Sequence, residues 1–200
     1  MNQKFFDLKS EKQDRIINAA LMIFALNGYK HASTDDIVKE AGISKGLLFH
    51  YFGSKSGLYS FLVDYSVKYL MYEYSRVIGE EGEYFAYHEK LMKAKTGVLQ
   101  NYPYMVEFVQ GAATWTDADC SDEAKAVISS YIKAMGDFEE SLSKPLLREG
   151  VDMVKVNNMI KYISQGLTRE SMESGNFHPE ALYTQIVEYM GMIRIMAMDR

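Results

Sequence analysis

Hydrogen-bonding and positively charged side chains gather between Thr34 and Lys55. Lys45 and Lys55 each directly follow a serine, and serine is a preferred residue immediately before the first turn of a helix. That first turn exposes unpaired backbone N–H groups and carries a partial positive charge, so it attracts phosphate. A lysine in the same place adds a full positive charge. The pattern therefore predicts a surface that binds phosphate groups.

Short helices separated by tight turns would position these side chains. Ser33 or Thr34 begins one predicted helix, which ends at Ala41. Gly42 then supplies a turn, because glycine tolerates the left-handed backbone that closes a helix. Ser44 begins a second helix of about two turns. Two short helices joined in this way form a helix-turn-helix.

The second of these helices is expected to have two distinct faces. Leu48 and Phe52 are four residues apart and mark the face that faces the core. Gly46 and His50 are also four residues apart, and they lie about 160° away around the helix axis. Because Gly46 has no side chain, this helix can lie close against another surface.

The stretch from Thr34 to Leu58 resembles the DNA-binding signature of the TetR family of transcriptional regulators, and residues 10–60 fit its pattern. The resemblance is carried by the Ala41-Gly42-Ile43-Ser44 turn, the Tyr51-Phe52 pair and Ser54-Lys55. It implies an all-α homodimer with a helix-turn-helix in its first three helices. Residues 1–53 would form the DNA-binding domain, and residues 54–200 a helical domain that binds ligands and dimerises.

The same resemblance implies which residues contact double-stranded DNA. Two early acidic residues, Asp35 and Asp36, depart from many relatives, and the apolar side chains on the reading helix offer no hydrogen bonds to bases. Phosphate or backbone contacts fall on Thr34, His50, Tyr51 and Lys55, and contacts at or near base edges fall on Lys45, Gly46, Leu47 and Phe49.

The rest of the chain is also expected to be helical. Its 200 residues contain only 3 prolines and no alternating apolar and polar run with a hairpin turn. A capping box is predicted at Ser10 and Gln13, and Asn27-Gly28 is predicted to end that helix. Later helices are predicted over residues 54–78, 83–102, 104–116, 121–149 with Pro145 as a place to bend, 152–173 and 179–198, giving nine in all.

The last two predicted helices are amphipathic. Their apolar stripes could pack on the rest of the chain or on a second copy, and periodicity does not separate these alternatives. The family resemblance implies a four-helix interface between two copies. The residues assigned to that dimer interface are Ile160, Ile163, Leu167, Leu182, Ile186, Met190 and Ile193.

Aromatic residues concentrate in the part of the chain after residue 60. Tyrosine and tryptophan combine an apolar face with a polar tip, which suits a pocket for a partly polar organic molecule. The alternative is that these side chains fill an ordinary core. The candidate ligand-binding residues are Tyr65, Tyr69, Tyr102, Met105, Phe108 and Trp115.

Catalysis and metal binding have little support in the sequence. The His88-Glu89 pair and the neighbours His178 and Glu180 are the only adjacent histidines and carboxylates, and we interpret both pairs as solvated. No nucleotide-binding loop or nucleophile elbow is present. The single cysteine, Cys120, lies in an acidic loop that disfavours its thiolate. We expect no catalytic residues, no cofactor and no metal.

Charge and hydropathy indicate which partners and which cellular location to expect for the protein. Residues 1–60 carry 8 Lys/Arg against 6 Asp/Glu, whereas the whole chain has a net charge of −5. The amino-terminal part is thus the less acidic one, which is compatible with a local anion-facing surface. The longest run without a charged residue covers residues 16–29, too short to cross a membrane. No secretory signal is recognisable, so a cytoplasmic protein is expected.

Two functions follow as hypotheses. The resemblance implies a transcriptional regulator, most simply a repressor that a small apolar or aromatic effector releases from an inverted-repeat operator. The alternative is an all-α protein that binds or converts small molecules and carries a vestigial helix-turn-helix. The sequence names neither the effector nor the operator.

Overall fold

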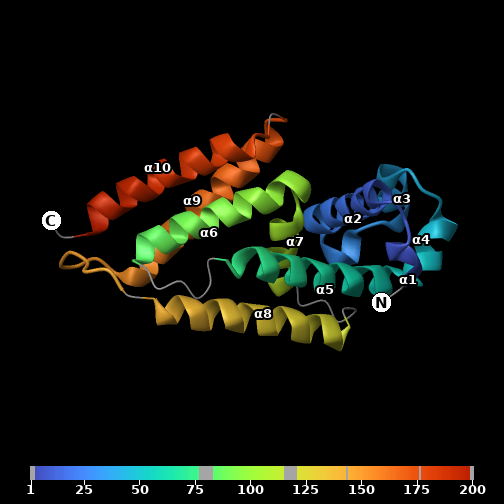
Figure 1. The fold of residues 1–200 in the computed structure, drawn as a ribbon, viewed down its shortest axis with the longest axis horizontal. Coiled ribbons are helices and arrows are strands. Elements are labelled where there is room, and N and C mark those ends of the chain that lie inside the picture. The colour runs from blue at the N-terminus through green and yellow to red at the C-terminus, as the bar shows by residue number, and fades with distance from the viewer. Residues whose placement is uncertain (1–2, 77–82, 115–120, 143, 176, 199–200) are drawn as a thin grey trace. The chain divides into compact units, whose positions relative to one another are not determined.

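The computed structural model describes residues 3–76, 83–114, 121–142, 144–175 and 177–198. Within these ranges the regular structure is helical, apart from an isolated antiparallel bridge between Leu147 and Met198. The predicted all-α class is therefore confirmed. The helices described are α1 (Gln3–Phe6), α2 (Ser10–His31), α3 (Thr34–Ala41), α4 (Lys45–Phe52), α5 (Lys55–Tyr74), α6 (Tyr84–Asn101), α7 (Met105–Thr114), α8 (Asp122–Ser141), α9 (Met153–Glu173) and α10 (Pro179–Ala197) (Figure 1).

The chain divides into two compact units. Unit 1 contains residues 1–73 and 101–137, and unit 2 contains residues 74–100 and 138–200. These boundaries differ from a division between residues 53 and 54, because the segment with α7 and most of α8 belongs to the same unit as the helix-turn-helix. The division into a DNA-binding and a ligand-binding domain stays a prediction about function.

Aromatic rings hold the core of unit 1 together. The ring of Phe24 in α2 contacts Tyr59 in α5 at 5.2 Å and Phe108 in α7 at 6.2 Å. Tyr59 and Phe108 also meet edge to face at 5.4 Å, which is a favoured arrangement of aromatic pairs. One three-way contact thus joins α2, α5 and α7.

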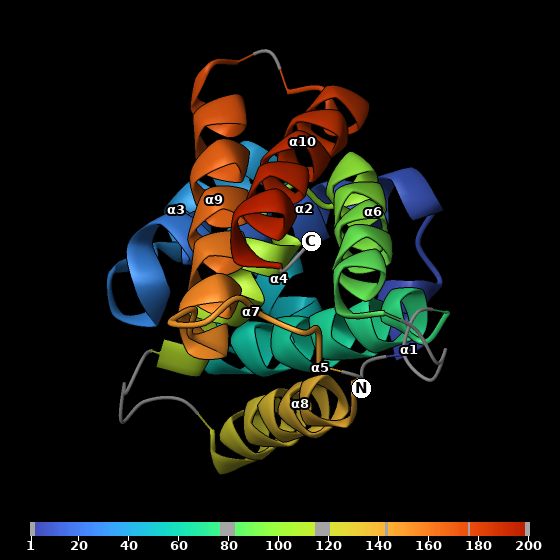
Figure 2. The same ribbon diagram turned by 90° about the vertical axis from the view of Figure 1, so that its left-hand side faces the viewer.

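In unit 2, α9 and α10 pack against each other, and both views show α6 beside them (Figures 1 and 2). Arg148 closes the end of α10, because its Nε and Nη2 donate to the carbonyls of Met198 at 2.7 Å and Ile195 at 3.0 Å. Arg194 of α10 lies 3.6 Å from the carboxylate of Glu83. These contacts bring the start of α6 and the end of α10 together.

The amino-terminal helix α1 was not expected, so the described ranges contain ten helices where nine were predicted. Phe5 is 1% exposed, and its ring contacts Tyr51, Phe52 and Phe61 at 5.0 to 5.8 Å. The signal was present in the apolar Phe5-Phe6 pair, but four residues are too few to show a helical period. α1 therefore covers the end of α4.

The predicted capping box at Ser10 is wrong. Lys9 occupies the N-cap of α2 and makes no side-chain cap bond. The Gln13 side chain instead donates to the carbonyls of Phe6 at 3.1 Å and Leu8 at 2.7 Å. The preceding α1 places these carbonyls within reach, and a local motif cannot foresee that competition. Gly28 breaks the helical backbone as predicted, with φ +69°, although α2 continues to His31 beyond the kink.

The helix predicted over residues 121–149 is shorter than expected. It begins where Ser121 accepts a hydrogen bond from the Ala124 amide at 3.2 Å, and α8 ends at Ser141. Pro145 disfavours helical backbone at the residue before it, so the helix stops rather than bends. The segment that follows instead forms the bridge of Leu147 with Met198.

Candidate nucleic-acid interface

Two serine N-caps and a glycine with left-handed backbone conformation define the ends of the helices in the helix-turn-helix. Ser33 caps α3 by accepting hydrogen bonds from the amides of Asp35 and Asp36. Gly42 ends α3 with φ +61°, a conformation that costs glycine little. Ser44 then caps α4 by accepting from the Leu47 amide at 3.2 Å. Each of these serines and the glycine lies where its residue type predicted.

Three apolar side chains fix the two helices against the core of unit 1. Ile37 and Ala41 of α3 are 0% exposed, and Leu48 of α4 is 1% exposed. Burial of such side chains is worth ~1.5–3 kcal/mol for the larger ones. This anchors one face of α4 and leaves the opposite face exposed, as the spacing predicted.

That opposite face carries the predicted reading residues. Lys45, Gly46 and His50 are exposed, and a methyl group added at Gly46 would meet no atom within 4 Å. The fold therefore does not require glycine at this position. Four further predicted contacts are partly buried around this face: Thr34, Leu47, Phe49 and Tyr51.

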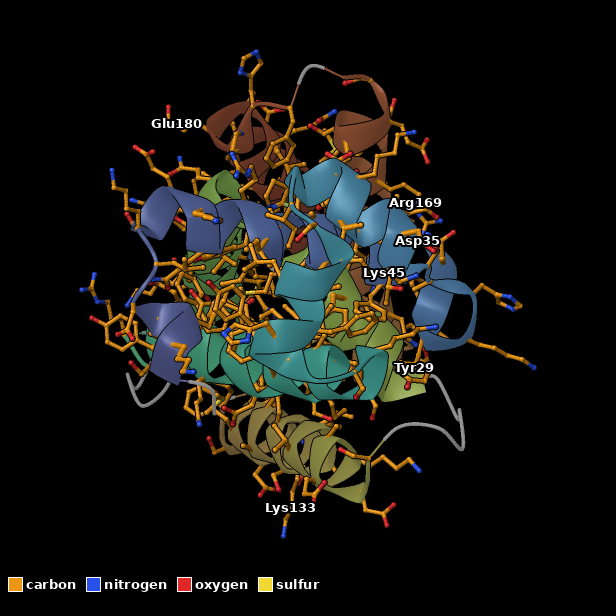
Figure 3. All side chains as sticks on the ribbon, turned by 90° about the vertical axis from the view of Figure 1, so that its right-hand side faces the viewer. Tyr29, Asp35, Lys45, Lys133, Arg169 and Glu180 are labelled. Atoms are coloured by element: carbon orange, nitrogen blue, oxygen red, sulfur yellow. The ribbon has the colours of Figure 1, made fainter. Side chains whose placement is uncertain are left out.

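Lys45 is paired with an acidic residue of the neighbouring helix. Its ammonium lies 2.9 Å from Asp35 Oδ1, and the two side chains are 49% and 70% exposed (Figure 3). An exposed ion pair is worth about 0 to 1 kcal/mol, so an external phosphate can compete for the lysine. The acidic residue that departs from the family pattern thus contacts a predicted DNA-binding residue directly.

We expect Asp35→Asn to raise affinity for duplex DNA by up to about fivefold, because it releases Lys45 and removes a negative charge. Asp36→Asn is the matched control, since it removes the same charge from the same exposed turn and leaves the Lys45 ion pair intact. Fluorescence anisotropy with labelled duplexes would measure both. Equal effects of the two variants would mean that the ion pair does not restrain Lys45.

Lys55 begins α5 as predicted, but it makes contacts that no sequence pattern suggested. Its ammonium donates to the Lys30 carbonyl at 3.2 Å and lies 4.9 Å from the centre of the Tyr29 ring. The lysine thereby ties the start of α5 to the end of α2. An ammonium has three N–H donors, so this contact leaves donors for an external phosphate.

The predicted aromatic ligand residues that the structure describes all belong to unit 1. Tyr65 and Tyr69 of α5 contact the Tyr102 ring at 5.9 and 5.0 Å. Met105 and Phe108 of α7 are 0% exposed and contribute to the core. Trp115 lies outside the described residues. Five of the six candidates are thus brought into one unit.

A chain of hydroxyl groups links this cluster to α2. Tyr102 donates to Asp14 Oδ1 at 2.8 Å, and the hydroxyls of Tyr65 and Tyr102 are 2.7 Å apart. Since Tyr102 has only one hydroxyl hydrogen, Tyr65 is the donor in the second bond. Burial, followed by these hydrogen bonds and the nearby carboxylate, raises the pKa of Tyr102. Both tyrosines therefore stay neutral and join α5 to α2.

The stripe assigned to the dimer interface lies mostly inside the chain. Five of its seven members are buried within the single chain, and the other two, Ile163 and Leu167, are partly buried. A side chain that is already buried in its own chain buries no further apolar surface against a second copy. The five buried members therefore fit the alternative in which the stripe packs on the rest of the same chain. The buried ones are Ile160, Leu182, Ile186, Met190 and Ile193, each 1–3% exposed.

A different apolar stripe is exposed on the same two helices. Its members follow helical spacing, and periodicity alone could not tell this stripe from the buried one. They are Met159 and Tyr162 on α9, at 42% and 63% exposure, and Tyr189, Met192, Ile195 and Met196 on α10, at 40%, 57%, 73% and 57%.

The interpretation of His88 as a solvated residue is wrong. His88 is 7% exposed, and burial lowers its pKa to about 4, with Lys95 adding a smaller effect. His178, in contrast, is exposed just before α10. Among the described residues no group of three or more His, Cys, Asp or Glu side chains is arranged to hold a metal ion. In the same ranges no helix is both long and apolar enough to span a membrane.

Comparison with known proteins finds a family model that matches the part of the chain containing this surface. Residues 16–60 match the family model described as bacterial regulatory proteins, tetR family. This part of the chain is therefore similar to the TetR family. The match covers most of α2 and all of α3 and α4. Lys45 and Gly46 lie on α4, within the matched part.

A curated relative is also described as a helix-turn-helix regulator. An uncharacterized HTH-type transcriptional regulator, YuxN of Bacillus subtilis (strain 168), is 26% identical over 164 residues, which cover 75% of this chain and 55% of the relative. The chain therefore spans about half the length of that curated relative.

Solved structures share the fold. A TetR family transcriptional regulator from Chloroflexus aurantiacus matches with TM-score 0.64 and 18% identity over 99% of this chain and 98% of its own. The ketosteroid transcriptional regulator KstR2 of Mycobacterium tuberculosis matches with TM-score 0.69 and 18% identity, covering 96% and 97% of the two chains. At this identity the likeness concerns the fold.

Proposed function

We propose that this chain binds an inverted repeat in double-stranded DNA as a homodimer and represses transcription until a small apolar or aromatic effector releases it. The observation that carries the proposal is the open backbone at Gly46. The fold leaves space for a side chain there, yet the position beside Lys45 is bare. A duplex that approaches α4 closely explains the missing side chain, because a recognition helix must enter the major groove.

The competing hypothesis is an all-α protein that binds or converts small molecules and no longer uses its helix-turn-helix. Exposed donors at Lys45 and His50 on α4 favour DNA binding, since both lie on the face of the helix away from the core. The experiment that separates the hypotheses is nuclease protection of the DNA upstream of the gene that encodes this chain. Protection of an inverted repeat supports the regulator, and the absence of sequence-specific retention supports the alternative.

We expect Lys55→Met to weaken binding to all duplexes similarly and to lower the salt slope by about one unit, because a phosphate contact carries no base information. Methionine keeps an apolar stem beside Tyr29 and removes the charge. Filter binding at several salt concentrations would measure the slope. Lys45→Ala should change operator preference more than the slope, and an unchanged slope in the Lys55 variant would remove its phosphate role.

Dimerisation through α9 and α10 is supported by the exposed apolar side chains on both helices, including Tyr162 and Ile195. One two-turn helix touches too few base edges to specify a site. A two-fold pair doubles the contacts and reads two half-sites about 34 Å apart.

The effector site that we propose is the aromatic cluster of Tyr65, Tyr69, Tyr102, Met105 and Phe108, with Trp115 nearby in sequence. An effector that displaces Tyr102 would break its hydrogen bonds to Tyr65 and Asp14, and so release α5 from α2. By linkage, operator DNA must weaken effector binding by the same factor, commonly about 5 to 150-fold. The emission of Trp115, the only tryptophan, reports the effector, and equal effector affinity with and without operator would contradict the coupling.

A further inference from the structure

The short helix α1 is fixed to the rest of unit 1 at two points. Phe5 is 1% exposed, and its ring packs on rings of α4 and α5 with centres 5.0 and 5.3 Å away. The Gln13 side chain of α2 donates to the carbonyls of Phe6 and Leu8. Four residues form too short a helix to be stable by themselves. These two sets of contacts therefore hold α1 in place.

The buried ring of α1 also contacts a residue that the sequence assigns to DNA. Phe5 and Tyr51 meet edge to face, with ring centres 5.8 Å apart and planes at 71°. Tyr51 lies in the last turn of α4, and its ring also contacts His50 at 5.4 Å. The Tyr51 ring thus has aromatic neighbours on α1 and on its own helix. Both Tyr51 and His50 are predicted contacts to phosphate or backbone, so α1 packs directly against the predicted DNA-binding surface.

The position of a tyrosine hydroxyl depends on the orientation of its ring. The oxygen lies at the far end of a rigid side chain with two rotatable bonds. A free ring samples several orientations, and binding must then select one of them at an entropic cost. Edge-to-face packing on Phe5 already restricts the Tyr51 ring before DNA is bound. Restricting one side chain in this way is worth about two- to tenfold in affinity.

We propose that α1 belongs to the DNA-binding surface and that Phe5 is a positioning residue, which orients Tyr51 so that its hydroxyl donates to a phosphate of the duplex. Phe5 acts through Tyr51 and does not itself contact DNA. The inference rests on the proposed DNA binding. It adds an element to it, because Phe5 and Gln13 both precede residues 16–60, the segment that matches the family model.

A double-mutant cycle tests the positioning role. Phe5→Leu keeps an apolar side chain in the buried site and removes the ring, whereas Tyr51→Phe keeps the ring and removes the hydroxyl. We expect Tyr51→Phe to weaken DNA binding by about tenfold. Phe5→Leu should weaken it by about two- to tenfold. The double variant should be no weaker than Tyr51→Phe alone, because the ring orientation no longer matters without the hydroxyl.

Fluorescence anisotropy of the full chain with two labelled duplexes provides the measurement. One duplex comes from the DNA upstream of the gene, and the other has an unrelated sequence. Since a phosphate contact carries no base information, Phe5→Leu should weaken both by the same factor. A phenylalanine that only supported the placement of α4 would instead change the preference between the two duplexes.

Phe6→Leu is the matched control on the same helix. Phe6 is 37% exposed, and its ring contacts Phe5 and Phe61 at 5.5 and 6.0 Å. This variant should leave DNA affinity within about twofold of the wild type. Gln13→Met removes the donor that fixes α1 and keeps the length of the side chain, so it should weaken both duplexes as Phe5→Leu does. Thermal unfolding verifies that each variant is folded at the assay temperature.

Three results would overturn the positioning role. They are unchanged affinity in Phe5→Leu or in Tyr51→Phe, losses that multiply in the double variant, and equal losses from Phe5→Leu and Phe6→Leu. Should Phe5→Leu fail to fold, Phe5→Met replaces it in the same cycle, because methionine fills irregular space. A wild-type chain that retains neither duplex would overturn the proposed DNA binding itself. Retention by the wild type with multiplying losses would overturn the role of Phe5 alone.

Discussion

Gly46→Leu is expected to abolish sequence-specific DNA binding while leaving the protein folded and slightly more stable. The added side chain meets no atom within 4 Å in the chain itself, so no clash opposes folding. Leucine is a better helix former than glycine, by about 0.5 to 1 kcal/mol in an exposed helix. A duplex lying against α4 would meet the new side chain at once. Affinity for the operator should fall at least tenfold, equivalent to ~1.4 kcal/mol or more.

Gly136→Leu is the matched control, because Gly136 is an exposed glycine within α8 and an added methyl group there also meets nothing. Thermal unfolding should show a similar small gain in both variants, whereas gel retardation should show a loss only for Gly46. Retained operator affinity in the Gly46 variant would mean that α4 does not approach DNA through this face. A fall in Tm would mean instead that Gly46 serves the fold.

The helix-turn-helix could be predicted in detail because its determinants are local. Ser33 and Ser44 cap helices that begin one or more residues later, and Gly42 adopts a left-handed backbone for reasons that lie in the residue itself. Each signal acts within about four residues. The sequence therefore specifies these turns without reference to the rest of the fold.

Contacts that depend on distant residues could not be predicted in this way. Lys45 pairs with Asp35 ten residues earlier, and Lys55 donates to the Lys30 carbonyl 25 residues earlier. The Gln13 side chain does not cap α2 as expected, because it donates instead to the carbonyls of Phe6 and Leu8. In each case a long polar side chain had several possible partners, and only the packing of neighbouring helices decided among them.

Amphipathic periodicity identified helices more reliably than it identified what covers them. The stripe with Ile186 and Met190 is apolar at helical spacing, and so is the exposed set with Met192 and Ile195. His88 shows the same limit, because comparison with adjacent Glu89 suggested a solvated pair. His88 is instead buried beside the Tyr84 ring, four residues earlier on the same helix, and this helical spacing could have indicated the contact.

The exposed stripe leads to the prediction with the other large effect, that Met192→Asp converts a dimer into a folded monomer. Met192 is 57% exposed in the single chain, so a charge there costs the monomer little. In a dimer that buries this residue, two carboxylates would lie close together without partners, which costs several kcal/mol. Light scattering at micromolar concentration should give twice the chain mass of 22.9 kDa for the wild type and the single mass for the variant.

Ile186→Asp distinguishes an interface from a core on the same helix. Ile186 is 2% exposed within one chain, so its replacement buries an unpaired carboxylate in the monomer itself. Because a domain is stable by only about 5 to 15 kcal/mol, this variant should unfold rather than dissociate. Ile132→Asp on α8 controls for an exposed apolar residue outside α9 and α10, at 48% exposure. A wild-type monomer, or a Met192 variant that remains dimeric, would place the interface elsewhere and would require another way to space two recognition helices on DNA.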